Sequence, residues 1–229
     1  MDHLLPLLLA ATTGFLSGLI LSIPVGPVNL TVLNEGTQRG FAWAALIGIG
    51  ATVMEVIYCT IAFTSFSELF QNHFFKAGIE IFSFVFMLYL GVKFLFATNV
   101  EAPAHFGAVA DRLQEQVGRR LHPHSAFMIG FVRVLGNPGV LLGWVVFGTT
   151  FVIHGLMQPN WPSKIACISG VGLATGSWFI CLSYGASKGQ GKFSNRTKLR
   201  MEHWSGVALL LLALCNGIHI VWQAAKHKL

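Results

Sequence analysis

Long apolar segments constrain the fold of this chain more than any other feature of its sequence. An α-helix needs about 20 apolar residues to cross the hydrocarbon core of a bilayer. We find six segments of this kind, separated by polar stretches. They are residues 4–34, 41–64, 77–97, 125–156, 163–187 and 203–223. The sequence therefore predicts an all-α integral membrane protein with six transmembrane helices.

The composition argues against several other classes of protein. Hydrophobic residues make up 54% of the chain and charged residues only 10%, so we expect no separate soluble domain. The alternating ten-residue strands that are typical of an outer-membrane barrel are absent from the sequence. Asp2 and His3 stand where a signal peptide has basic residues, so we interpret the first segment as a retained span. The four cysteines lie inside the predicted spans at wide spacing, which favours buried apolar packing over a disulfide framework or a zinc site.

Positive residues are distributed unevenly between the two sides of the predicted membrane. The net charge of +6 comes from loops and not from a nucleic-acid-binding module, so we expect no nucleic-acid partner. Of the fifteen Lys and Arg residues, ten fall on one side, four on the other, and Arg133 within a span. Because positive loops stay in the cytoplasm, both termini are expected outside it. The amphipathic stretch at 98–124 and the basic loop at 188–200 would then contact the cytoplasmic lipid surface.

The first apolar segment is interrupted beyond its middle. Pro24, Gly26 and Pro27 stand within four residues, and the apolar run then resumes around Asn29. Prolines remove backbone donors, and glycine loosens the helix. In lipid, such a break persists only where protein or a wet cavity surrounds the freed carbonyl groups. The break therefore predicts either a substrate site in the membrane or a proline kink that fits two helices together.

The fourth apolar segment resembles the first when the sequence is shifted by 112 residues. Gly18 then matches Gly130, and a break at Asn137-Pro138 stands opposite the first break. Three spans in each half is an odd number, so the second half would be inverted relative to the first. We therefore expect two inverted three-helix repeats whose first helices are broken by proline and glycine. The repeats would comprise residues 1–97 and 125–229, joined by the linker at 98–124 within one membrane domain.

Two charged residues stand inside the predicted spans. Glu55 lies among apolar neighbours, where burial favours the protonated form of a carboxyl group, as a proton relay requires. Arg133 precedes the second break by about one helical turn, and its exposure to lipid would be costly. It can pair with Glu55 or hold a substrate carboxylate through a bidentate contact. For both residues, the alternative is a purely structural hydrogen bond or ion pair.

These motifs together resemble the LysE/RhtB superfamily of amino-acid exporters over nearly the whole chain. They are the Pro24-Val-Gly-Pro27 break followed by Asn29, the segment from Gly50 to Glu55, the Leu88-Tyr-Leu-Gly91 end of the third span, and the Asn137-Pro138 break. The resemblance implies a small protein with six spans in a bacterial-type inner membrane. It also implies amino-acid export driven by the proton gradient, often by a homodimer.

The resemblance also assigns candidate residues. The family's break residues carry over to Pro24, Gly26, Pro27, Asn137 and Pro138. The family's second-span acid is usually Asp after Gly, whereas this chain has Glu55 after Met54. It also has Gly139 where Lys often follows Asn-Pro, and Arg133 is not expected of every member. These departures are typical of a divergent branch of the family.

We therefore expect an exporter of amino acids or related zwitterions that works by alternating access. The expected substrate-binding residues are Pro24, Gly26, Pro27, Asn29, Arg133, Asn137 and Pro138, and the expected proton-coupling residue is Glu55. The alternative is a divalent metal-cation exporter, suggested by nine histidines, although no acidic or thiolate cluster accompanies them. A third hypothesis is a membrane sensor or scaffold. No catalytic motif is present, so we expect neither an enzyme nor a bound cofactor or metal.

Overall fold

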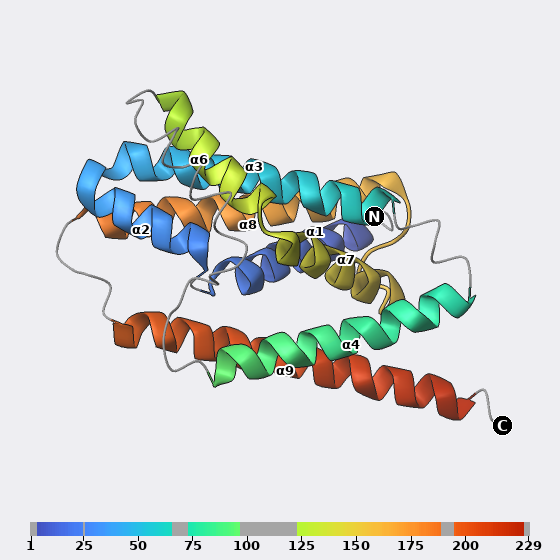
Figure 1. The fold of residues 1–229 in the computed structure, drawn as a ribbon. Helices are drawn as coiled ribbons and strands as arrows, with labels where there is room; N and C mark the ends of the chain where they lie inside the picture. The colour runs from blue at the N-terminus through green and yellow to red at the C-terminus, as the bar shows by residue number, and fades with distance from the viewer. Residues whose placement is uncertain (1–3, 25, 66–72, 97–122, 189–194, 227–229) are drawn as a thin grey trace.

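All helices and strands assigned in the described part of the protein are α-helices (Figure 1). The structure is a computed structural model that describes residues 4–24, 26–65, 73–96, 123–188 and 195–226. The helices of the first half are α1 (Leu4–Ser22), α2 (Pro27–Arg39), α3 (Phe41–Ser65) and α4 (His73–Leu95). Those of the second half are α6 (Pro123–Leu135), α7 (Pro138–Ile153), α8 (Trp161–Ser187) and α9 (Asn195–Lys226). The prediction of an all-α protein is confirmed.

Several helices are long and apolar enough to cross a bilayer. Four described helices pass this test alone, namely α1, α3, α8 and most of α9. The pair α6 and α7 passes as one span bent by 64°, which raises the number to five. The third predicted span contains the shorter apolar helix Ile81–Leu95. The chain is therefore a multi-pass membrane protein, and the count of six spans stays a prediction.

The first predicted span is divided between two helices of different character. α1 is apolar and ends at Ser22, whereas α2 carries Glu35 and Arg39 and is not among the span candidates. The transmembrane candidate therefore ends at Ser22 and does not continue to residue 34 as we expected. The physical reason is that the chain leaves helical geometry before Gly26, and Pro27 then starts a new helix.

The last helix starts earlier than its apolar sequence predicted. α9 begins at Asn195, so the second part of the expected basic loop at 188–200 is helical. Lysine and arginine are good helix formers, which allows the helix to continue beyond its apolar part. The amphipathic helix expected within 98–124 lies outside the described residues, apart from residues 123 and 124, which begin α6.

Glycine allows α1 and α8 to pack closely along much of their length. A Cβ on Gly14 would overlap the carbonyl group of Cys167, and a Cβ on Gly170 would overlap the carbonyl group of Ala11. Gly18 also faces α8, beside Val171. Gly14 and Gly18 therefore serve close helix packing, because small residues let backbones approach in a membrane.

A second close crossing joins α6 to α3. A Cβ on Gly130 would overlap the carbonyl group of Ile47, and one on Gly50 would overlap that of Phe127. Each crossing thus pairs a glycine on the helix before a break with a glycine on a neighbouring long helix. These contacts make Gly130 the counterpart of Gly14. The shift of 112 residues had paired Gly130 with Gly18, which lies one helical turn further along α1.

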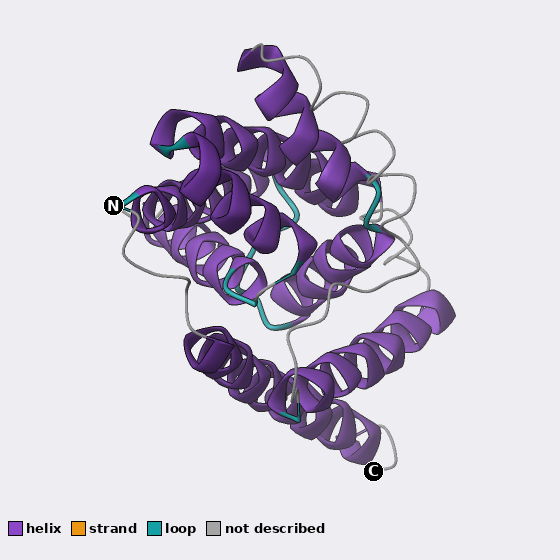
Figure 2. Cartoon of the chain, turned by 60° about the vertical axis from the view of Figure 1, so that its left-hand side comes forward, coloured by secondary structure: helices purple, strands orange, loops and turns teal. Residues whose placement is uncertain are grey.

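Helices α4 and α9 form a separate layer beside the other six (Figures 1 and 2). They cross where Gly206 of α9 meets the backbone of Gly91 and Leu95 of α4. This layer touches the remaining helices mainly through α4 and α7. The broken helices and the long pair α3 and α8 therefore form a cluster of their own, which contains the predicted site.

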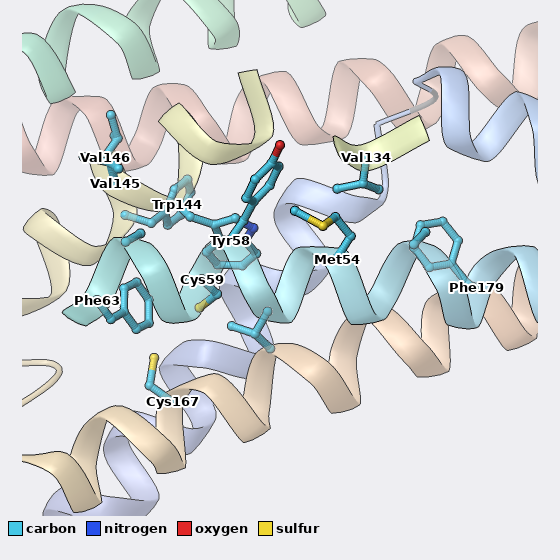
Figure 3. Packing of buried hydrophobic residues seen from close by; sticks show 14 of the residues in the cluster. Met54, Tyr58, Cys59, Phe63, Val134, Trp144, Val145, Val146, Cys167 and Phe179 are labelled. Atoms are coloured by element: carbon cyan, nitrogen blue, oxygen red, sulfur yellow. The ribbon is translucent and has the colours of Figure 1, made fainter. Parts of the chain in front are cut away.

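The core of this cluster lies along α3 and its neighbours (Figure 3). Met54, Phe63 and Trp144 are buried there, with less than 5% of their surface exposed. Cys59 and Cys167 are buried at the crossing of α3 and α8. Cys181 and Cys215 are exposed, so the expectation that all four cysteines are buried was wrong for two of them. They lie on the outer faces of α8 and α9, where the apolar sequence is compatible with lipid contact.

Candidate functional site

The first break is held together by the side chain of Asn29. Gly26 caps α2 in an extended conformation, and Pro27 occupies its first turn, where a missing N–H costs nothing. The Nδ2 atom of Asn29 donates hydrogen bonds to the carbonyl groups of Ser22 at 2.8 Å and Pro24 at 2.6 Å. Two carbonyl groups freed by the break are therefore satisfied by a buried amide from the next helical turn.

Trp178 of α8 orients this amide from the opposite side. Its indole Nε1 donates a hydrogen bond of 3.2 Å to the Oδ1 atom of Asn29. Both ends of the Asn29 side chain are thus engaged within the protein. In this conformation Asn29 stabilises the break, and its predicted contact with substrate would use the second acceptor position of Oδ1 or replace one of these bonds.

The second break is more compact than the first. The N–H groups of Gly136 and Asn137 still bond to the carbonyl groups of Val132 and Val134, at 2.8 and 2.9 Å. Asn137 then caps α7, because its Oδ1 atom accepts a hydrogen bond of 3.2 Å from the N–H group of Gly139. Only Gly136 and Asn137 therefore separate the end of α6 at Leu135 from the start of α7 at Pro138.

Tyr58 of α3 supplies the partner for a carbonyl group at this break. Its hydroxyl group donates a hydrogen bond of 2.8 Å to the carbonyl oxygen of Leu135, the last residue of α6. The Tyr58 ring projects from α3 among buried apolar side chains (Figure 3). Each break is thus tied by a side-chain donor to a long helix from the other half of the sequence.

Glu55 lies on the same face of α3, three residues before Tyr58. Only 7% of its surface is exposed, and its Oε2 atom is buried without a hydrogen-bond partner in the described part of the chain. A charge in such surroundings is costly unless a donor or a counter-ion approaches. The carboxyl group is therefore suited to receive a proton or a ligand contact near the second break.

Arg133 lies half-buried in the last turn of α6, two residues before Leu135. A cation at this position complements the negative end of the helix dipole. The Tyr58 bond to Leu135 joins the helix that carries Glu55 to the helix that carries Arg133, and an ion pair between these two side chains is not among those found within the described residues. The ion pair within the described ranges is between Glu35 and Arg39, at 3.1 Å. Glu35 is thus paired with Arg39 of its own helix, and the roles predicted for Glu55 and Arg133 stay predictions.

The two breaks lie within one cluster of helices. α1 contacts α7, and α2 contacts α6. Leu21, next to the end of α1, faces Gly143 of α7. Pro24, Gly26, Pro27 and Asn29 therefore belong to one side of the candidate site, and Glu55, Arg133, Asn137 and Pro138 belong to the other.

The sequence reasoning missed Tyr58 and Trp178. It treated the breaks as patterns of proline and glycine and did not ask which donors would reach the freed carbonyl groups. A signal was available, because Tyr58 and Trp178 are 120 residues apart, as are Gly50 and Gly170. A comparison of the second span with the fifth would have aligned both pairs.

Histidines form one small cluster away from the breaks. The rings of His154 and His219 lie 4.5 Å apart between centroids, and His154 Nε2 lies 3.4 Å from Asn216 Oδ1. Within the described ranges, no group of three or more His, Cys, Asp or Glu residues has the arrangement of a metal site. The histidine cluster therefore adds no support to the metal-cation alternative.

Comparisons with known proteins cover both breaks and both intramembrane charges. A family model described as LysE type translocator matches residues 19–218 of the chain. A protein of Bacillus subtilis (strain 168) is 25% identical over 212 residues, which cover 93% of this chain and 95% of that protein. It is named "Putative amino acid efflux protein YcgF". No solved structure matches the chain.

Proposed function

Because this chain belongs to the LysE type translocator family, we propose that it exports amino acids or related small zwitterions as a secondary active transporter. The observation that carries this proposal is the buried carboxyl group of Glu55, which has no hydrogen-bond partner at Oε2 among the described residues and lies on a helix that is bonded to the second break. An ionisable group inside a membrane protein is costly to keep and is usually functional. The similarity to a protein named for amino acid efflux supports the direction and class of transport.

The proposed transport pathway runs between the two breaks. Carbonyl groups and the amino ends of α2 and α7 would contact the substrate near Pro24, Gly26, Pro27, Asn137 and Pro138. Amino ends of helices favour anionic groups, so they suit the carboxylate of an amino acid. Asn29 would exchange one of its present hydrogen bonds for a substrate contact, and Arg133 would hold the carboxylate through its guanidinium group.

Glu55 is the proposed proton-coupling residue. Its carboxyl group would bind a proton from one side of the membrane and release it to the other as the pathway changes access. Arg133 would influence this step through the contact of its helix with α3, which the Tyr58–Leu135 hydrogen bond supports. Proton binding and substrate binding would then compete within one small region of the protein.

The proposed architecture consists of six spans in two inverted repeats, residues 1–97 and 125–229. The glycine crossings of α1 with α8 and of α6 with α3 support this proposal, because each joins a broken helix to a long helix of the other repeat. Excess Lys and Arg on one side supports a cytoplasmic linker and both termini outside the cytoplasm, in a bacterial-type inner membrane. We extend the proposal to a homodimer in contact with anionic lipid.

Export from proteoliposomes tests this function directly. Vesicles containing the full chain are loaded with a labelled amino-acid mixture and diluted into buffer with or without an inward proton gradient. We expect gradient-dependent loss of one or a few amino acids. Retention of all of them by folded protein in sealed vesicles contradicts the proposal, and gradient-dependent loss of divalent metal instead would favour the metal-cation alternative.

Two Glu→Gln variants test whether proton coupling depends on Glu55 in particular or on any buried glutamate. Glu55→Gln removes the ionisable group, and we expect at least about a tenfold fall in gradient-driven export, a common effect of losing an acid–base group. Glu35→Gln is the matched control, because Glu35 is already paired with Arg39. Equal activity of Glu55→Gln and the unmodified protein would exclude Glu55 as the coupling residue.

A further inference from the structure

The two long helices α3 and α8 pack in an antiparallel arrangement with a definable midpoint. Gly48 of α3 packs against Phe179 of α8. Eight residues further along α3, Val56 packs against Gly172 of α8. The contact later in α3 is thus made by the residue earlier in α8, so the two helices run in opposite directions. Met54 is two residues before Val56, and Ala174 is two residues after Gly172, so these two residues lie at one level, which we take as the midpoint of the pair because they are 120 positions apart.

The same spacing of 120 residues relates other contacts of the two helices. It relates Gly50 to Gly170, the glycines at the close crossings with α6 and α1. It also relates Ile47 to Cys167, whose carbonyl groups face Gly130 and Gly14. Corresponding positions of α3 and α8 therefore have corresponding environments, which is the behaviour of two elements related by an internal two-fold axis.

Tyr58 and Trp178 are also 120 residues apart, and each donates a hydrogen bond to the break in the other half of the chain. Tyr58 donates to the carbonyl group of Leu135, at the end of α6. Trp178 donates to Asn29, which in turn donates to the carbonyl group of Ser22, at the end of α1. The sequence of the two halves differs here, but the function of the two aromatic donors is the same.

These two hydrogen bonds lie on opposite sides of Glu55 along the bundle. Tyr58 is four residues from Met54, and Trp178 is four residues from Ala174, which places each donor about 6 Å from the midpoint at 1.5 Å per residue. Because the helices are antiparallel, the two displacements point in opposite directions. Glu55, one residue from the midpoint, therefore lies between the level of Tyr58 and the level of Trp178.

We propose that Tyr58 and Trp178 are a matched pair of positioning residues, each of which holds closed one side of the pathway around Glu55. This inference rests on the proposed transport function. Opening the pathway toward the side where α3 ends would separate the two halves at Tyr58 and Leu135. Opening it toward the other side would separate them at Trp178 and Asn29. Loss of either donor should therefore favour opening on its own side only.

Cysteine labelling measures the two openings independently of any substrate. Cys167 lies near the level of Tyr58, and its counterpart Ile47 lies near the level of Trp178; both side chains are 0% exposed. Cys167 serves as one reporter in the full chain carrying Cys59→Ala, Cys181→Ala and Cys215→Ala. Ile47→Cys, combined with Cys167→Ala, serves as the other. Each is treated with a membrane-impermeant maleimide in right-side-out and inside-out vesicles.

Tyr58→Phe and Trp178→Phe remove the donors and keep aromatic rings. We expect Tyr58→Phe to increase the labelling rate of Cys167, and Trp178→Phe to increase that of the Ile47→Cys reporter, from opposite sides of the membrane. The expected increase is about twofold to tenfold, the range for one hydrogen bond. An equal increase at both reporters, or no change at either, would overturn the proposal.

A donor-retaining substitution separates the hydrogen bond from ring packing. Trp178→His keeps a ring N–H group, and we expect its labelling to lie closer to that of the unmodified protein than to that of Trp178→Phe. If Trp178→His and Trp178→Phe label alike, the donor is not what holds this side closed. The protein could export no amino acid while Tyr58→Phe and Trp178→Phe still raise labelling from opposite sides of the membrane. That result would reject the proposed substrate class and leave the paired positioning role intact.

Discussion

The indole nitrogen of Trp178 lies 3.2 Å from the side-chain oxygen of Asn29, a residue 149 positions earlier in the sequence. This contact fixes which end of the amide faces the break. The other end then donates to two carbonyl groups that α1 and α2 leave unused. A break that would be costly in an apolar environment is thereby stabilised by one side chain.

Replacing Asn29 should destabilise the protein more than its size suggests. Asn29→Leu keeps a similar volume but leaves the carbonyl groups of Ser22 and Pro24 without their donor. We expect the free energy of unfolding in detergent to fall by about 2–3 kcal/mol. Asn34→Leu is the control, because Asn34 is exposed on the same helix and bonds through its side chain to Gln38. Similar losses in both variants would contradict this account of the break.

The glycine crossing of α3 with α6 should not tolerate a methyl group. In Gly50→Ala, the new Cβ would overlap the backbone of Phe127, which must move. We expect a loss of about 1–3 kcal/mol, as for other overpacked contacts. Gly78→Ala offers a matched control in α4, because a Cβ there meets no atom of the described residues within 4 Å. That variant should gain up to about 1 kcal/mol in helix stability, and a thermal unfolding series would show the contrast.

Glu55 should reduce stability while it supports transport. Glu55→Leu replaces a buried carboxyl group, whose Oε2 atom has no hydrogen-bond partner in the part of the chain that the structure describes, with an apolar side chain. We expect an increase of about 1–3 kcal/mol in the free energy of unfolding, together with loss of export. Glu35→Leu, which removes the partner of Arg39, should bring no such gain. A less stable Glu55→Leu variant would indicate that Glu55 has a structural role.

The cap of α7 should contribute to stability through one oxygen atom. Asn137→Ala removes the acceptor of the Gly139 N–H group, and we expect a loss of about 1 kcal/mol. Asn137→Ser, which retains an acceptor, should recover most of it. Asn160→Ala removes the equivalent cap of α8, where Asn160 accepts from Ser163, and should cost a similar amount. Export should fall in Asn137→Ala and stay unchanged in Asn160→Ala, and equal export in both would argue against a substrate role for Asn137.

Much of this protein could be predicted from local sequence. Apolar runs indicated helices α3 and α8 nearly to their ends, and Pro27 and Pro138 indicated where α2 and α7 begin. The resemblance to amino-acid exporters was confirmed by the family match. Burial of Glu55 was also expected, because a carboxyl group within an apolar run must enter the protein interior. Each of these features depends on a few neighbouring residues, which the sequence specifies directly.

The partners across the fold were decided only by the tertiary structure. The sequence did not indicate that Tyr58 would reach Leu135 or that Trp178 would orient Asn29, because these contacts join residues 77 and 149 positions apart. It left open the pairing of Glu55 with Arg133, which is not found among the described residues, and it placed both sides of the first break in one broken span. Local sequence determines that a helix break leaves carbonyl groups without their helical hydrogen-bond donors. Which donors satisfy them depends on how closely glycine lets the surrounding helices approach, and that is set by the packing of the whole cluster.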